Sequence, residues 1–254
     1  MEIIMSAKRF LGRKVLMTGA ATGVGNVLMH QLLAEGAIVV AGDIESSIEK
    51  TASDAGCVGV VADISNAAGC RWLHEAATAH FGAPDVLISN AGFIVPKPIL
   101  ETSEEEWDQV MAVNAKALFL LSKLVIPGML EGGRGSIVAT ASISGMVGLG
   151  SQAAYCAAKG AIVQLVRQLA VEYAANNIRV NAVGPGAIAT PFLDRYIDAQ
   201  PDPKAAEDAV RAAHPMNRWA TPQEVGNAIA YLASDDASFV TGHILMVDGG
   251  YVAR

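Results

Sequence analysis

The chain has 254 residues, of which 52% are hydrophobic and 17% charged, and its formal net charge is −7. This acidic balance argues against nucleic acid or an anionic membrane surface as the main partner. The three cysteines are scattered and the five histidines do not cluster, so we expect neither a disulfide framework nor a metal site.

Short apolar runs alternate with helix-length segments along the whole chain. Strands are predicted over residues 14–18, 38–43, 58–63, 86–90, 136–141, 179–183 and 244–247. Helices are predicted over residues 24–35, 67–81, 104–129, 153–176 and 222–233. Regular alternation of this kind predicts a doubly wound parallel sheet with helices on both faces. No linker, repeat or low-complexity tract interrupts it, so we interpret residues 1–254 as a single α/β domain.

No segment predicts secretion or a membrane span. The apolar run at residues 3–5 is too short for a signal peptide. The most apolar stretch, residues 117–130, is too short to span a bilayer and is interrupted by Ser122, Lys123 and Pro127. We therefore expect a cytoplasmic protein.

Residues 187–218, called the insert below, lack a strand pattern although they lie between two predicted strands. A long irregular segment in a compact domain is typically functional or mobile, so we favour a substrate lid over a plain surface excursion. One apolar helical face is expected from Phe192, Leu193, Tyr196 and Ile197, while Asp194, Arg195 and Asp198 are expected to point elsewhere. Pro201 and Pro203 would end this helix, and residues 204–213 can form another.

A glycine-rich turn joins the first strand to the first helix. It reads Thr18-Gly-Ala-Ala-Thr-Gly-Val-Gly25, and such turns bring backbone close to a pyrophosphate at a helix N-terminus. Glycine also simply makes tight turns, so the motif alone is weak. The next strand ends at Asp43, 20 residues beyond Gly23. A carboxylate there can bind the adenosine ribose and repel a 2′-phosphate, although Asp43 is also a plausible helix N-cap. We favour ribose contact, which predicts NAD as the cofactor.

Tyr155 and Lys159 lie four residues apart in a helical pattern, which places both on one helix face. A phenol with a pKa of about 10 is a poor base near neutrality, and a nearby ammonium favours the phenolate. A tyrosine and a lysine at this spacing often occur by chance, so the pair alone is weak evidence for a catalytic site. It gains weight from Ser142, 13 residues before Tyr155 at the end of a strand, and from Asn114, a polar residue in an apolar helix.

Together these motifs resemble the short-chain dehydrogenase/reductase family from about residue 14 to residue 250. The resemblance implies a Rossmann-like sheet of seven parallel strands. It also implies a set of cofactor-binding residues, namely Thr18, Gly19, Gly23, Val24, Gly25, Asp43, Asp63, Ile64, Asn90, Ala91, Gly92, Tyr155, Lys159, Pro185, Gly186, Ile188 and Thr190.

The resemblance further implies a role for each catalytic residue. Tyr155 is the acid/base, and Lys159 lowers its pKa and holds the nicotinamide ribose. Ser142 orients the substrate oxygen, with Ser144 the alternative serine, and Asn114 organises a water-linked proton path.

The sequence thus predicts an oxidoreductase that moves a hydride between NAD(H) and a small, alicyclic or polyol-like secondary alcohol or ketone. A 3-oxoacyl-thioester reductase of the same family is the alternative. Such enzymes commonly use NADPH, often carry a basic residue in the turn where this chain has Ala-Ala-Thr, and meet an acidic carrier that a net charge of −7 would repel. A non-catalytic dinucleotide-binding regulator is the alternative from another class, but it has no need of the four catalytic residues together.

A homo-oligomer, expected to be a tetramer, is also predicted. The helices at residues 104–129 and 153–171 carry more apolar surface than one sheet face covers. The residues concerned are Leu118, Phe119, Leu121, Ala161, Ile162, Leu165 and Leu169.

Overall fold

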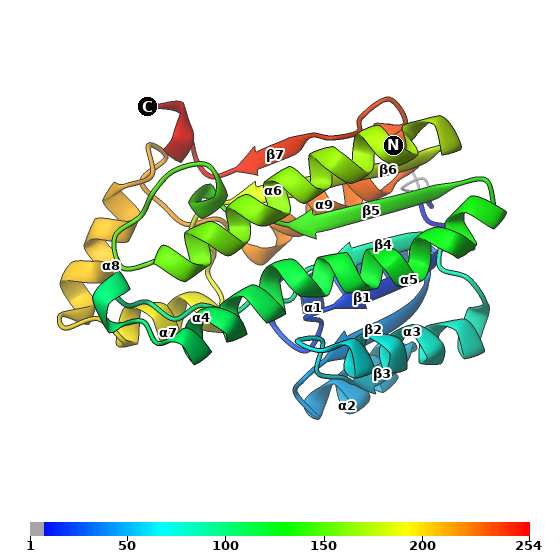
Figure 1. Ribbon diagram of the computed structural model, residues 1–254, viewed down its shortest axis with the longest axis horizontal. Coiled ribbons are helices and arrows are strands. Elements are labelled where there is room, and N and C mark those ends of the chain that lie inside the picture. The colour runs from blue at the N-terminus through cyan, green and yellow to red at the C-terminus, as the bar shows by residue number, and fades with distance from the viewer. Residues whose placement is uncertain (1–7) are drawn as a thin grey trace, which may run out of the picture.

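A computed structural model describes residues 8–254, so the apolar run at residues 3–5 lies outside the described residues. Seven parallel strands form one sheet in the order β3-β2-β1-β4-β5-β6-β7 (Figure 1). They are β1 (Lys14–Thr18), β2 (Ile38–Asp43), β3 (Val58–Val61), β4 (Val86–Ser89), β5 (Gly135–Thr140), β6 (Ile178–Pro185) and β7 (Ile244–Val247). This confirms the predicted seven-stranded parallel sheet. The strand order reverses between β1 and β4, which opens a crevice at the carboxyl ends of the strands.

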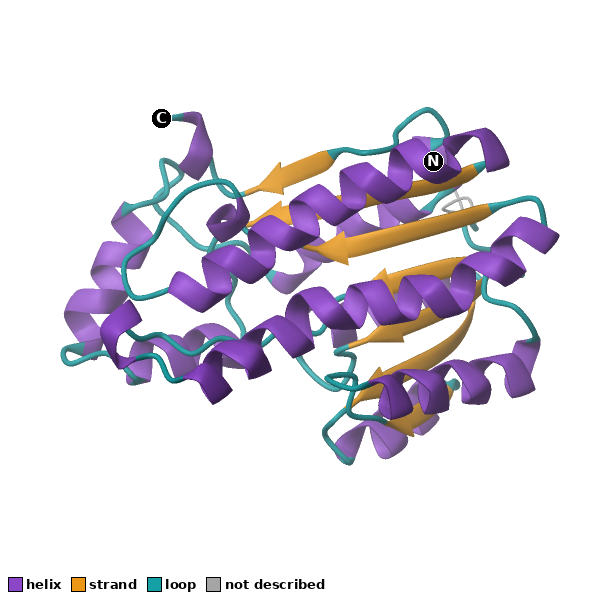
Figure 2. Ribbon diagram, viewed as in Figure 1, coloured by secondary structure: helices purple, strands orange, loops and turns teal. Residues whose placement is uncertain are grey.

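Helices cover both faces of the sheet (Figure 2). On one face lie α1 (Gly23–Ala34), α2 (Ser47–Ala55) and α9 (Pro222–Ala233). On the other lie α3 (Ala67–Phe81), α5 (Ala117–Glu131) and α6 (Ala153–Tyr173). Because both faces are covered, the strands are almost continuously apolar and supply the floor of two hydrophobic clusters.

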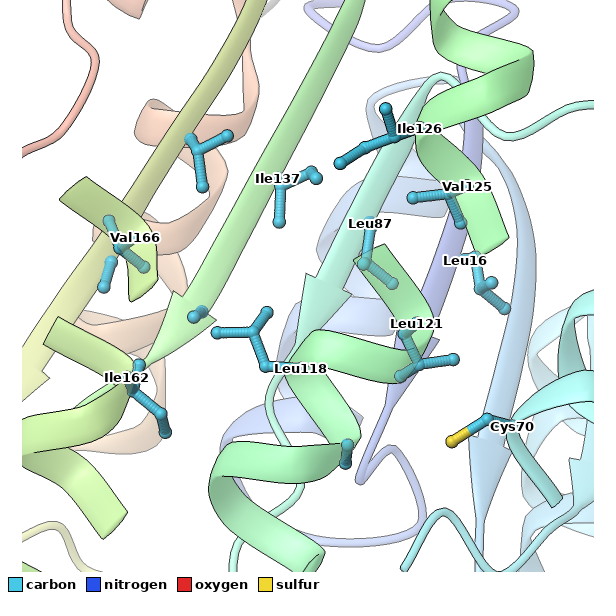
Figure 3. Close-up of a cluster of buried hydrophobic side chains, with 14 of the residues drawn as sticks. Leu16, Cys70, Leu87, Leu118, Leu121, Val125, Ile126, Ile137, Ile162 and Val166 are labelled. Atoms are coloured by element: carbon cyan, nitrogen blue, oxygen red, sulfur yellow. The ribbon is translucent and has the colours of Figure 1, made fainter. Parts of the chain in front are cut away.

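The cluster under α5 shows how the sheet positions the middle of the molecule. Leu87 of β4 and Ile137 of β5 pack against Leu118 and Leu121 of α5, and all four side chains are fully buried (Figure 3). Burial on this scale contributes roughly 1.5–3 kcal/mol for each such side chain. The carboxyl ends of β4 and β5 are thereby held in register.

Helix α2 was not predicted from the sequence, and the long apolar helix differs from its prediction in length and in internal geometry. Only Ile48 and Ala52 of α2 are buried, which leaves too few apolar positions for a visible period. The segment predicted over residues 104–129 consists of α4 (Glu104–Met111), a π-helical turn Ala112–Lys116 and α5. These form one continuous helix, Glu104–Glu131, of 28 residues.

By length and composition this one helix is apolar enough to cross a membrane, with a mean hydropathy of 1.6 over its most apolar window. The apolar stretch predicted at residues 117–130 covers only the second part of this helix, so its length was underestimated. In the fold, α5 packs on the sheet as a core helix, and 44% of that window is buried inside the chain.

The insert folds into two short helices, α7 (Pro191–Asp198) and α8 (Pro203–Ala212), beyond the carboxyl ends of the strands (Figure 1). A helical pair is therefore confirmed. Pro203 begins the second helix instead of ending the first, because a proline at the first helical position loses no hydrogen bond. Asp202 caps this start, its Oδ1 accepting a hydrogen bond from the Ala205 amide at 3.0 Å.

Candidate active site

A cavity of about 940 Å³ lies at the carboxyl ends of the strands and extends from the glycine-rich turn to the insert. It is lined by every cofactor residue expected from the sequence except Gly25, and by three of the four expected catalytic residues. Asn114 is the exception among the latter. The fold therefore brings together expected residues from seven separate stretches of the chain into one concave surface.

The glycine-rich turn is closely packed against the loop that follows β4. Gly19 has a positive φ of +68°, and a Cβ there would overlap the backbone of Ala91. A Cβ on Gly25 would overlap the carbonyl oxygen of Gly19. Gly25 consequently serves the packing of α1 on the turn and does not face the cavity.

Asn90 joins the loops that follow three strands. Its backbone amide donates to Thr18 Oγ1 at 3.1 Å, and its Nδ2 donates to the Gly19 carbonyl at 3.0 Å. The hydroxyl of Thr140, at the end of β5, donates to Asn90 Oδ1 at 3.1 Å. This hydrogen-bond network fixes the cavity floor between the glycine-rich turn and the predicted catalytic residues.

One end of the cavity is acidic. Asp43, Glu45 and Asp63 line it, and none of the lysines and arginines that line the cavity belongs to this end. Asp43 Oδ2 accepts a hydrogen bond from the Ala21 amide at 2.9 Å, which ties β2 to the glycine-rich turn. The N-cap alternative for Asp43 is wrong, because Ser46 is the residue that precedes α2. Hydrogen bonds from Ser65 and Asn66 hold the pKa of Asp63 below its usual range.

Tyr155 and Lys159 lie on one face of α6, as the spacing predicts, and both side chains are buried. Lys159 Nζ donates to the Thr140 carbonyl at 2.7 Å and lies 5.3 Å from the centroid of the Tyr155 ring. Burial lowers the pKa of Lys159 to about 7. Burial also raises the pKa of Tyr155 well above its usual range, and interaction with the Ser142 hydroxyl acts in the opposite direction.

In the chain without a cofactor the effect of burial dominates at Tyr155, and the lowering of this pKa by Lys159 stays a prediction. The Lys159 ammonium donates its hydrogen bond to the Thr140 carbonyl, and the Tyr155 phenol is buried in surroundings that disfavour its charged form. The protein environment by itself therefore keeps Tyr155 protonated.

Ser142 and Ser144 are joined in one hydrogen-bonded chain. Ser142 Oγ donates to Ser144 Oγ at 3.3 Å, and Ser144 Oγ donates to Gln152 Oε1 at 3.0 Å. All three side chains are buried and line the cavity. Gln152 was not identified from the sequence, because a lone glutamine before a helix carries no motif signal. Its carbonyl orients Ser144, and Ser144 in turn orients Ser142.

Asn114 lies behind the cavity wall in the π-helical turn. Its Nδ2 donates to the carbonyls of Phe93 and Val110, both at 2.8 Å, and its side chain is 2% exposed. A Cβ on Gly92 would lie 3.3 Å from Asn114 Oδ1. The wide turn thus places an amide against the loop that follows β4, where it holds Phe93. The water-linked path proposed for Asn114 stays a prediction.

The insert contributes most of its predicted apolar face to the cavity, together with one residue that was expected to point elsewhere. Phe192, Leu193 and Tyr196 line the cavity, whereas Ile197 is buried outside its lining. The Phe192 ring lies 6.3 Å from the Tyr155 ring, centroid to centroid. Arg195, expected to point elsewhere, also lines the cavity.

Comparison with known proteins identifies the family. The family model described as enoyl-(acyl carrier protein) reductase matches residues 19–252. A cis-4-hydroxycyclohexanecarboxylate dehydrogenase from Sinomonas cyclohexanicum is 40% identical over 96% of this chain and 98% of its own. The chain belongs to the short-chain dehydrogenase/reductase family.

Two further relatives in this family carry different activities in their names. The levodione reductase crystal structure superimposes with a TM-score of 0.90 at 35% identity, over 96% of this chain and 99% of the other. A 3-oxoacyl-(acyl-carrier-protein) reductase from Thermotoga maritima is 35% identical over 96% of this chain and 99% of its own. This short-chain dehydrogenase/reductase is therefore an oxidoreductase of the type that uses a nicotinamide dinucleotide.

Proposed function

We propose that the protein is an NAD(H)-dependent dehydrogenase that interconverts an alicyclic secondary alcohol and its ketone. The observation that carries this proposal is the position of Tyr155, whose ring meets the cavity between Ser142 and the apolar face of α7. The similarity to a dehydrogenase of a hydroxycyclohexane carboxylate supports a ring-bearing substrate.

The glycine-rich turn and the start of α1 fit the dinucleotide. A side chain on Gly19 would collide with the neighbouring loop, so backbone alone forms this wall of the cavity. Within residues 8–254 the side chain of Thr22 does not cap α1, so the first amides of the helix are available to a pyrophosphate. Gly19, Gly23 and Val24 would hold the phosphates, and Pro185 to Thr190 would hold the nicotinamide amide.

A preference for NAD over NADP is supported by charge. The end of the cavity that receives the adenosine is lined by the carboxylates of Asp43, Glu45 and Asp63, and Ile44 stands beside Asp43 where a basic residue would pair with a phosphate. A 2′-phosphate would meet like charge there without a compensating cation.

The chemistry divides between protein and cofactor. When bound, the oxidised dinucleotide supplies the carbon that accepts hydride and a positive ring charge that favours the Tyr155 phenolate. In the oxidation of an alcohol, the phenolic oxygen of Tyr155 takes the hydroxyl proton, and in reduction it returns a proton to the carbonyl oxygen. The Ser142 hydroxyl, which donates to Ser144 in the chain alone, would turn to donate a hydrogen bond to the same oxygen. Phe192 and Tyr196 hold the apolar part of the substrate and exclude water.

The test is turnover of a panel of secondary alcohols with NAD⁺ and with NADP⁺, in the wild type and in Tyr155→Phe. We expect cyclic alcohols to be oxidised with NAD⁺, and a loss of kcat of at least about 100-fold in the variant, the lower part of the range for positioned acid–base catalysis. Binding of NAD⁺, followed by thermal shift, should survive because the ring remains. Reduction of 3-oxoacyl thioesters with NADPH but not of cyclic ketones would support the alternative activity instead. Tyr155→Phe retaining a tenth of wild-type kcat would refute the acid/base assignment.

We further propose a homo-oligomer, with a tetramer as the expected state. Leu118, Leu121 and Ile162 turn out to be internal, which removes them from the argument. Phe119, Leu130 and Val171 on α5 and α6 are exposed, Val171 at 83%. Closed symmetric assembly is the common way to cover such a surface. A monomer by light scattering at micromolar concentration would contradict it.

A further inference from the structure

The cations of the insert differ in their surroundings. Lys204 pairs with Asp208 at 2.9 Å, Arg211 with Glu207 at 2.9 Å, and Arg218 with Glu224 at 2.7 Å. Arg195, the remaining cation, forms no ion pair with any residue in the described range 8–254, although Asp194 and Asp198 lie on the same helix. It is also the one of the four that lines the cavity.

Arg195 lies about one helical turn from Phe192 on α7. Phe192 packs beside Tyr155, and Arg195 follows three residues later on the same side of the helix. One helical turn advances about 5 Å along the axis. Arg195 and Tyr155 therefore line the same cavity, and Phe192 lies next to Tyr155.

The rest of that space is apolar or neutral. Phe93, Ile94 and Leu149 line it together with the uncharged amides of Gln109 and Gln152. The carboxylates that line the cavity, Asp43, Glu45 and Asp63, all belong to the adenosine end. Among the residues that line the cavity beside the insert, an anionic substrate thus meets no carboxylate, and Arg195 can bind a carboxylate in the bidentate geometry that a guanidinium favours.

Building on the proposed function, we propose that Arg195 is a specificity-determining residue that binds a carboxylate on the substrate. The substrate class is an alicyclic secondary alcohol whose carboxylate lies across the ring from the carbinol carbon. Arg195 binds this group while Tyr155 and Ser142 bind the hydroxyl, so the ring is held at both ends.

The test compares two cyclic alcohols, one of which carries the carboxylate group that the other lacks. Turnover of cis-4-hydroxycyclohexanecarboxylate and of cyclohexanol with NAD⁺ is measured in the wild type, Arg195→Gln and Lys204→Gln. Lys204→Gln is the matched control, because it removes the same charge from the insert at a residue outside the cavity. In Arg195→Gln we expect kcat/KM for the carboxylate to fall roughly 10- to 100-fold, chiefly through KM, as for the loss of a charged hydrogen bond. Cyclohexanol in this variant, and both alcohols in Lys204→Gln, should stay within about twofold of wild type.

Other outcomes separate the alternatives. An equal loss for both alcohols would place Arg195 on the cofactor or on closure of the insert and would overturn the proposal, as would no loss at all. A wild type that oxidises cyclohexanol without preferring the carboxylate would refute only the inference about Arg195. A wild type inactive on both alcohols would refute the proposed function. Binding of cyclohexanecarboxylate, measured by thermal shift in the wild type and Arg195→Gln with NAD⁺ present, would then still test the carboxylate site, and an equal shift would overturn it.

Discussion

His214 Nε2 accepts a hydrogen bond from the backbone amide of Ala187 at 3.1 Å, which joins the end of α8 to the segment that follows β6. His214 Nδ1 lies 2.7 Å from the Val210 carbonyl, so the ring proton belongs on Nδ1. A Cβ on Gly186 would overlap the imidazole. The histidine thus fills a space that only glycine leaves open, beside the residues expected to hold the nicotinamide. No sequence pattern around His214 indicated this contact.

We expect His214→Ala to weaken dinucleotide binding. The variant leaves the Ala187 amide without its acceptor and empties the space beside Gly186, at a cost of roughly 1–3 kcal/mol in stability. KM for NAD⁺ should rise about 5- to 50-fold, while kcat at saturation changes less. His214→Gln, whose carbonyl oxygen can accept from Ala187, should recover part of the loss. Equal effects of the two variants on KM would show that the hydrogen bond is irrelevant.

We expect the wild type to prefer NAD⁺ over NADP⁺ by at least about tenfold in kcat/KM. Asp43→Ala should reduce this preference, because kcat/KM falls with NAD⁺ and rises with NADP⁺. The variant loses the acceptor for the ribose hydroxyls and removes the repulsion of a 2′-phosphate. Because Asp43 also accepts from Ala21, a thermal melt should accompany the kinetics. Asp43→Asn, which keeps the shape of the side chain, is the matched control for that structural role. Equal efficiency of the two cofactors in the wild type would contradict the assignment.

The buried ammonium of Lys159 predicts a pH-dependent stability difference. Burial lowers its pKa to about 7 in the folded chain, against about 10.5 when unfolded, so the unfolded chain binds more protons between these values. The stability of the wild type attributable to this group therefore rises with pH across that window and is lost again as pH falls to 7.

Lys159→Met removes this dependence while keeping an unbranched side chain of similar length. The variant should gain stability relative to wild type at pH 7, and the gain should shrink toward pH 10 by up to roughly 1.4 kcal/mol per pH unit. Chemical denaturation of both proteins at several pH values measures the difference. A difference independent of pH would mean that Lys159 stays protonated in the fold, held by the Thr140 carbonyl.

We expect the insert to close over bound substrate. Phe192, Leu193 and Tyr196 line the cavity while Ile197 of the same helix is buried outside its lining, so α7 is positioned to cover a ligand without unfolding. Amide hydrogen exchange in residues 187–218 should slow when NAD⁺ and an alcohol bind. Phe192→Ala and Tyr196→Ala should change KM or substrate preference. Exchange that is slow and independent of ligand, with unaltered kinetics in both variants, would favour the permanent docking of α7.

Local physical rules explain what the sequence by itself determined. Strand and helix periods predicted the alternating sheet. Asp43, Asn90 and Ser142 each lie at or just after the end of a strand, and the carboxyl ends of parallel strands share one edge, so the three residues line one cavity. Helical spacing placed Tyr155 and Lys159 on one face. Such inferences need only the chain's own geometry, and the fold agrees with them.

Only the tertiary structure determines the features that depend on how helices and loops pack against one another. The side of α7 that faces the cavity cannot be read from its period alone, so Arg195 was assigned to the wrong face. The π-helical turn that withdraws Asn114 behind Gly92 depends on how the long helix meets the loop after β4. The pKa of Tyr155 in the chain without a cofactor is raised by burial, which depends on every neighbour in space, whereas sequence spacing reports only one of them, Lys159.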